Sequence, residues 1–315
     1  MAHRYLTFFV WAIFMIGTNS PLPAHPGHGI AVDSNKNLYF TDISRQTIWK
    51  IPPEGLPQPL ITNTWSHPLF INAKDEIFVA HEEFLHGTPN YILWKINENG
   101  SEIVLLPQKD RKDFDGSTFV IDPAGNIYFS YENYRENKYY IMQRQNKGRA
   151  KIFAGGKRGH KDGKGKKAKF NGFRAMAMRP NGAIYVADVD AVRKITPEGV
   201  VSTIASGLLE ENPKDLPFQH ENPSTANRLY GLVVDNDGSV YVAYYGNRLL
   251  LKIEPDGTTL AVYRSEKPWS PVGVALDGSD VYILESGLEP GSKTPGPRVR
   301  KLSPDMQITT IIVIK

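Results

Sequence analysis

The chain has 315 residues, 41% of them hydrophobic, and a formal net charge of +4. A charge this mild does not by itself indicate a nucleic-acid partner. The absence of cysteine excludes disulfides, thiolate catalysis, zinc–thiolate sites and iron–sulfur clusters. The length suits one domain, and strands rich in Val, Ile, Tyr and Phe without a long helical period predict an all-β fold.

Residues 1–24 are predicted to form a secretory signal peptide. Arg4 gives a charged start, residues 6–17 are continuously apolar, and a polar segment follows at residues 18–20. The apolar run is shorter than the roughly 20 residues of a membrane span, although an uncleaved anchor is the competing interpretation. We therefore expect cleavage after Ala24 and a secreted or periplasmic protein.

Residues 25–315 are predicted to form a single domain built from a repeated unit. In residues 230–257 the β-prone runs GLVV, VYVAY and LLLKI are separated by turn sequences. Five similar units occur elsewhere, and a fourth β-prone run follows each third one. The second run of each copy has a central aromatic residue: Tyr39, Phe78, Tyr128, Tyr185, Tyr241 and Tyr282.

Six copies of a four-stranded meander predict a six-bladed β-propeller of four-stranded antiparallel blades. The first copy supplies its own fourth strand and the last copy ends in ITTIIVI. We therefore expect the ring to close by packing of the first blade on the last, without an exchanged strand.

The best-matching copy, residues 170–205, reads FNGFRAMAMRPNGAIYVADVDAVRKITPEGVVSTIA and resembles the NHL repeat. The resemblance covers nearly all of residues 25–315 and implies a six-bladed propeller. The wider group of similar propellers includes gluconolactonase-like hydrolases and peptide-amidating lyases. The resemblance therefore brings these activities into consideration, although one fold hosts many functions.

Two positions in each predicted blade converge at one end of the central channel, which we call the channel mouth. They are the residue before the first strand and the last residue of the second strand. A slip of one residue in this register would move every member of the set. The polar members predicted to form a ligand-binding face are His28, Asp42, His67, His81, Arg174, Asp188, Tyr230, Tyr244 and Glu285.

Four of these residues, on adjacent copies, are candidate ligands for a divalent metal such as zinc or calcium: His28, Asp42, His67 and His81. The lyase-like relatives hold metal through histidine, and the gluconolactonase-like relatives through carboxylate and amide groups. Neither pattern is matched residue by residue in this chain. The alternative is that Asp42 and Asp188 accept backbone N–H bonds in the following turn, while the histidines and tyrosines fill a solvated channel.

A long basic segment, residues 155–172, connects the third copy to the fourth. It has seven lysines and arginines and one acidic residue, Asp162. It lacks the G-K-[ST] ending of a phosphate-binding P-loop. It is therefore either a solvated loop or a contact for anionic ligands such as acidic glycans, and predicted export argues against nucleic acid. The lysines before Ile or Leu in third strands are expected to be exposed: Lys50, Lys95, Lys194, Lys252 and Lys301.

The sequence thus predicts an exported NHL-type propeller that binds a small molecule, a glycan or a protein partner at its channel mouth. The alternative function is a metal-dependent lactonase, hydrolase or lyase that uses the same face. No G-x-S-x-G nucleophile elbow is present to support a Ser-His-Asp hydrolase. An open, metal-free face would favour binding, whereas a closed pocket with perturbed titratable groups would favour catalysis.

Overall fold

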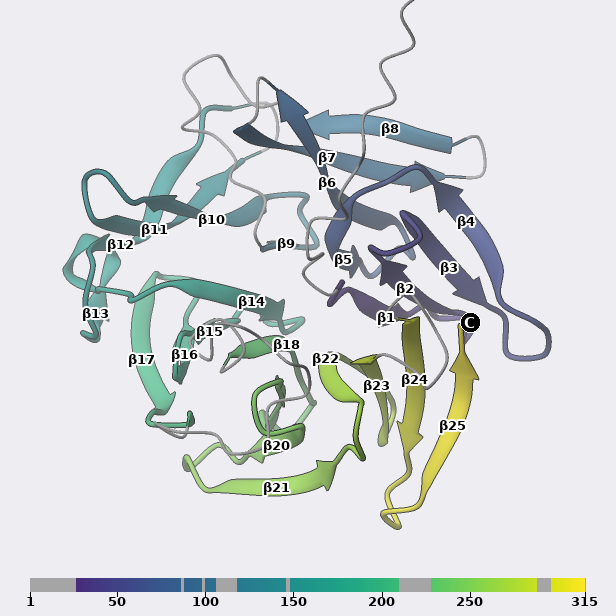
Figure 1. The fold of residues 1–315 in the computed structure, drawn as a ribbon. Helices are drawn as coiled ribbons and strands as arrows, with labels where there is room; N and C mark the ends of the chain where they lie inside the picture. Colours follow the sequence, from purple (N-terminus) through teal and green to yellow (C-terminus); the bar gives the residue numbers. More distant parts are fainter. Residues whose placement is uncertain are drawn as a thin grey trace, which may run out of the picture.

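The computed structural model describes residues 27–85, 88–97, 100–105, 118–145, 148–209, 228–287 and 296–314. The predicted signal peptide, residues 1–24, lies outside the described residues. Six antiparallel sheets are arranged around a central channel as the blades of a propeller (Figure 1). The predicted all-β six-bladed propeller is therefore confirmed. Within the described ranges the helical element is η1 (Gly165–Lys167), and no helix there is long and apolar enough to cross a membrane.

Each blade is built on a meander of four consecutive strands, and the first strand of each meander lines the channel. Blades 1 and 2 contain β1 (Ile30–Val32), β2 (Leu38–Asp42), β3 (Thr47–Ile51), β4 (Gln58–Thr62), β5 (Ser66–Ile71), β6 (Ile77–Leu85), β7 (Thr88–Asn97) and β8 (Gly100–Leu105). Blades 3 and 4 contain β9 (Phe119–Ile121), β10 (Ile127–Asn133), β11 (Lys138–Arg144), β12 (Lys151–Lys157), β13 (Gly163–Lys164), β14 (Phe173–Met178), β15 (Ile184–Asp188), β16 (Ala191–Ile195) and β17 (Val200–Ala205). Blades 5 and 6 contain β18 (Leu229–Val234), β19 (Val240–Tyr244), β20 (Leu249–Ile253), β21 (Thr259–Arg264), β22 (Ser270–Asp277), β23 (Asp280–Gly287), β24 (Gly296–Leu302) and β25 (Ile308–Val313).

The core lies between the blades. In the described part of the chain, a cluster of buried apolar side chains occupies each boundary between neighbouring blades. Strand β15 shows why: Ile184 and Val186 pack toward blade 3, whereas Tyr185 and Ala187 pack toward blade 5. Successive side chains of a strand point to opposite faces, so a central strand buried on both faces is apolar throughout.

The repeated lysine of the third strand lies beside the repeated tyrosine of the second strand. Lys194 is paired across the sheet with Tyr185, and its ammonium lies 5.9 Å from the ring centroid. Equivalent contacts of 5.7–6.0 Å occur in blades 1, 5 and 6. These lysines are therefore not merely exposed, because each covers an aromatic ring with its stem and places its charge over the face of the ring.

Blade 6 closes the ring against blade 1. Ile30 and Phe40 of blade 1 share a buried cluster with Val272, Leu284 and Val299 of blade 6. Each of these two blades is built from its own consecutive strands, so closure without an exchanged strand is confirmed for the described chain.

Glycine lets the inner strands approach closely near the channel mouth. A Cβ atom on Gly273 would lie 2.5 Å from the carbonyl oxygen of His28, and one on Gly231 would lie 2.7 Å from the Cα of Gly273. The channel is consequently narrow. A cavity between the inner strands, lined by residues such as Leu69, Phe119 and Leu232, has a volume of about 50 Å³, which is room for a few water molecules. Ordinary ligand pockets occupy about 300–1,000 Å³.

The basic segment at residues 155–172 is more ordered than the predicted solvated loop. Strand β12 extends into it, β13 adds a fifth strand to the outer edge of blade 4, and η1 follows. Ala168 and Phe170 are fully buried, and Arg193 from β16 lies 5.2 Å from the centroid of the Phe170 ring. The segment therefore caps blade 4, while most of its lysines remain exposed.

Candidate functional site

β-bulges at the start of the inner strands bring polar side chains to the channel mouth. The register between first and second strands shifts at Ser66–Leu69, Phe173–Ala175 and Leu229–Leu232. His67, Arg174 and Tyr230 lie inside these shifts. A bulge interrupts strand alternation and re-aims the extra side chain. Tyr230 nevertheless stays buried, in the apolar cluster that joins blades 1 and 6.

Three aromatic side chains from blades 1, 2 and 5 meet at the mouth. The ring centroids of His28 and His67 are 6.1 Å apart, as are those of His28 and Tyr230. The backbone N–H groups of His28 and Gly29 both donate to the His67 carbonyl oxygen, at 3.2 and 2.8 Å. Burial, with His67 nearby, lowers the pKa of His28 to about 3, so this imidazole is neutral at physiological pH.

Two carboxylates at the mouth were not among the predicted residues. Glu82 follows His81, and its Oε2 lies 3.5 Å from Nε2 of His67. Glu132 follows Tyr131, and its Oε1 accepts the Phe173 N–H at 2.7 Å. Both residues therefore lie one position beyond the predicted register. Glu82 and Glu132 occupy equivalent positions in the second and third copies, so an alignment of the copies could have identified both.

The predicted carboxylates at the ends of second strands have structural partners instead. Asp42 accepts the Arg45 backbone N–H at 3.1 Å, its guanidinium at 3.2 Å and the Trp49 indole N–H at 3.2 Å. In blade 6, Glu285 is fully buried and accepts Nε of Arg298 at 2.6 Å. The turn-forming alternative thus describes Asp42 correctly, and Glu285 belongs to a buried ion pair.

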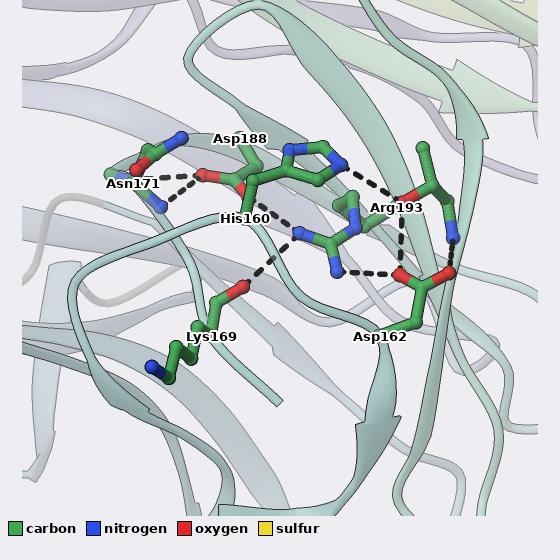
Figure 2. Close-up of polar contacts among 8 residues, drawn as sticks. His160, Asp162, Lys169, Asn171, Asp188 and Arg193 are labelled. Carbon is green, nitrogen blue, oxygen red and sulfur yellow. Dashed lines mark hydrogen bonds and ion pairs between the residues drawn. The ribbon is translucent and has the colours of Figure 1, made fainter. Parts of the chain in front are cut away.

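Asp188 is the centre of a buried polar network in blade 4 (Figure 2). Its Oδ1 accepts the backbone N–H groups of Asn171 and Gly172 at 2.7 and 3.0 Å, and its Oδ2 accepts Arg193 at 2.8 Å. Arg193 also contacts Asp162 at 2.7 Å. Burial raises the pKa of Asp188, although these donors oppose that effect. The network holds the basic segment on blade 4 rather than serving the mouth.

His81 and Tyr244 are also buried in the fold. The His81 ring stacks on Trp94 at 3.9 Å, and its Nδ1 lies 3.1 Å from the Thr64 hydroxyl. Tyr244 is 1% exposed and packs in the cluster between blades 4 and 5. Of the nine predicted residues, contacts between aromatic rings bring three together at the mouth: His28, His67 and Tyr230.

Arg174 belongs to the same end of the channel, together with an arginine that the sequence analysis missed. Arg228 directly precedes β18 and forms a hydrogen bond with the Tyr230 hydroxyl. Burial, with Arg174 nearby, lowers the pKa of Arg228. The predicted strand began after Tyr230, whereas β18 begins at Leu229, so the sequence analysis assigned Tyr230 rather than Arg228 to the position before the strand.

The four candidate metal ligands have different neighbours in the structure. His28 and His67 are adjacent, but Asp42 is bound to Arg45 and Trp49, and His81 is stacked on Trp94. Across the described ranges, no group of three or more His, Cys, Asp or Glu side chains has an arrangement suited to a metal ion. The set of four stays a prediction, in which Asp42 and His81 have other partners in this structure.

A family model described as the SMP-30/Gluconolactonase/LRE-like region matches residues 26–284. The chain belongs to this family. A comparison with curated protein sequences gives no significant match. The finer resemblance to the NHL repeat stays a resemblance, because the matching model describes the wider gluconolactonase-like group.

Solved structures share the fold at low sequence identity. Virginiamycin B lyase from Staphylococcus aureus is 15% identical, with a TM-score of 0.54 over 92% of this chain and 85% of that one. A gluconolactonase from Xanthomonas campestris is 11% identical, with a TM-score of 0.56 over 81% of each chain. A putative gluconolactonase is 13% identical, with a TM-score of 0.58 over 91% of this chain and 90% of that one. At such identities the likeness establishes the propeller fold alone.

Proposed function

We propose that this protein is exported and binds a small polar ligand at its channel mouth. The observation that carries the proposal is the convergence of His28, His67 and Tyr230 from separate blades. Imidazole and phenol groups combine an apolar ring with a hydrogen-bonding edge, which suits recognition of a polar ligand. The cavity of about 50 Å³ between the inner strands is too small for such a ligand, so in this proposal the ligand rests on the mouth.

Titration calorimetry of the protein lacking residues 1–24 tests this proposal. Gluconate, glucitol and glucono-δ-lactone are suitable probes, because they share one carbon skeleton and differ in charge and ring closure. His67→Ala and Tyr230→Ala should each weaken binding, whereas Asp280→Ala, at the end of β23 away from the mouth, should not. If none of the three probes binds, or if both mouth variants bind as the native protein does, the proposal fails.

A second candidate function is opening of a lactone ring, by hydrolysis or elimination. Family membership and one contact favour it: the His67 imidazole lies 3.5 Å from the Glu82 carboxylate. A carboxylate beside an imidazole orients the ring and stabilises its protonated form, which is the arrangement of a general base. In this role His67 would take a proton from water or from the substrate, and Glu82 would hold the ring.

Acid release from glucono-δ-lactone in a pH-stat separates the two functions. Catalysis predicts a rate above that of buffer, lost in His67→Ala and strongly reduced in Glu82→Gln. Assays with and without added divalent cations cover the metal dependence that the family suggests. A native rate equal to buffer under both conditions, with probe binding retained, would eliminate the lactonase and leave ligand binding.

A further inference from the structure

Two arginines from neighbouring blades lie on one side of the channel mouth. Arg174 occupies the bulge of β14, and Arg228 directly precedes β18, the adjacent inner strand (Figure 1). The Arg228 side chain is hydrogen-bonded to the Tyr230 hydroxyl, and the Tyr230 ring lies 6.1 Å from that of His28. The arginine pair is therefore continuous with the aromatic cluster of the mouth.

Among the described residues, neither arginine has a carboxylate partner of the kind that two other buried arginines have. Arg193 contacts Asp162 and Asp188, and Arg298 contacts Glu266 and Glu285. Over the described residues, no ion pair joins Arg174 or Arg228 to an acidic side chain.

Glu132, on the blade beside Arg174, already has other donors. It accepts the Phe173 N–H and the Tyr134 hydroxyl. Arg174 and Arg228 are both half-buried, so solvent screens their mutual repulsion only in part. Burial and the proximity of Arg174 lower the pKa of Arg228, as expected for two like charges that share a space. An anion between them would relieve this repulsion.

We propose that Arg174 and Arg228 form an oxyanion site that binds a carboxylate or phosphate group of the ligand. The inference rests on the proposed function, because it names the ligand class of the same mouth. Guanidinium groups present planar forks of N–H donors that match the two oxygens of such an anion. The oxyanion would lie on the β14–β18 side, and the His28 and His67 rings would face the uncharged remainder of the ligand.

Calorimetric titrations with gluconate, glucitol and inorganic phosphate test the site. Gluconate and glucitol share a polyol skeleton and differ in the carboxylate, and the phosphate titration distinguishes the two kinds of oxyanion. The native protein should bind gluconate more tightly than glucitol, with an advantage that shrinks as NaCl rises. Replacing both arginines with methionine should weaken gluconate binding about tenfold to a hundredfold and leave glucitol binding unchanged.

Arg179→Met is the matched control, because Arg179 follows the far end of β14 and contacts the Asn236 carbonyl. It should bind gluconate as the native protein does. Replacement of both arginines with lysine keeps the charge but loses the fork, and should restore only part of the affinity. Circular dichroism and thermal melts establish that each variant is folded, and the single Arg174→Met variant replaces the double one if that fails to fold.

Equal affinity of the native protein for gluconate and glucitol would overturn the oxyanion site but leave the ligand-binding mouth intact. So would unchanged gluconate binding in the arginine variants. If the native protein binds gluconate and glucitol equally and His67→Ala loses glucitol binding, the mouth recognises the polyol alone. If neither gluconate nor phosphate binds at tens of millimolar concentration, the oxyanion site is also overturned.

Discussion

Replacing Arg193 with leucine should destabilise the protein severely. The Arg193 side chain is fully buried and joins Asp188 at 2.8 Å, Asp162 at 2.7 Å and the Lys169 carbonyl at 3.2 Å (Figure 2). Without Arg193, the fully buried Asp188 keeps only the two backbone N–H donors that bind its Oδ1. Removing one member of a buried ion pair costs about 3–5 kcal/mol, because the remaining charge is uncompensated.

The expected fall in Tm follows from the size of the domain. An unfolding entropy of about 2.1 cal/mol/K per residue gives roughly 0.6 kcal/mol/K for a domain of this length. The Tm should therefore fall by about 5–8 °C, measured by differential scanning calorimetry. Adding Asp188→Asn to the Arg193→Leu variant removes the uncompensated charge and should recover part of that loss.

Lys301→Met is the control, because Lys301 pairs with Asp280 at 2.6 Å where both side chains are partly exposed. Solvent screens this pair, so its loss should cost at most about 1 kcal/mol. An Arg193→Leu variant as stable as Lys301→Met would refute the reasoning. So would a double variant no more stable than Arg193→Leu alone, because the two charges would then not be coupled.

Three further predictions follow from the packing and titration of single residues. Gly273→Ala should lower the Tm, since its Cβ would lie 2.5 Å from the His28 carbonyl oxygen and overpacking costs about 1–3 kcal/mol; an unchanged Tm would contradict the close approach of the inner strands. The lowered pKa of His28 makes the unfolded state bind the proton more readily, so stability should fall as the pH decreases from about 6.5 to 3, by up to about 1.4 kcal/mol per unit. Denaturant titrations at several pH values should show that the stability of His28→Gln changes less steeply with pH than that of the native protein. An equally steep change would assign the pH dependence to other groups. Glu285→Gln should lower stability, because Arg298 loses its buried partner, but it should leave gluconate affinity unchanged. Weaker gluconate binding in a folded variant would show that Glu285 takes part in binding at the mouth.

The strands could be predicted because their signals recur six times and are local. Alternating apolar residues and turn sequences mark each strand, and the predicted runs VYVAY and LLLKI coincide with β19 and β20. The buried central strands follow from the same pattern, because both of their faces are covered by neighbouring blades.

The candidate site was predicted less well because bulges set its register. The β6 side chain that reaches the mouth is Glu82 rather than His81, and β5 pairs with β6 through a shifted register. Alternation along a strand makes a shift of one residue decisive, and no feature of the sequence marks the bulge. The buried role of Glu285 had a signal, since Arg298 lies directly opposite it in β24.

The basic segment shows why tertiary packing can reverse an interpretation based on composition. Its charge and glycine content are typical of a solvated loop, but Phe170 and Ala168 anchor it on blade 4. Asp162, its one acidic residue, contacts Arg193 from β16. Sequence separation hides this contact, because the two residues meet only after blade 4 has formed.

A crystal structure of the protein with bound gluconate tests the central claim most directly. The account predicts ligand density at the channel mouth, with its carboxylate against the guanidinium groups of Arg174 and Arg228 and its polyol near His28 and His67. Density confined to the exposed lysines of residues 155–172, or to the outer strands of the blades, would contradict it.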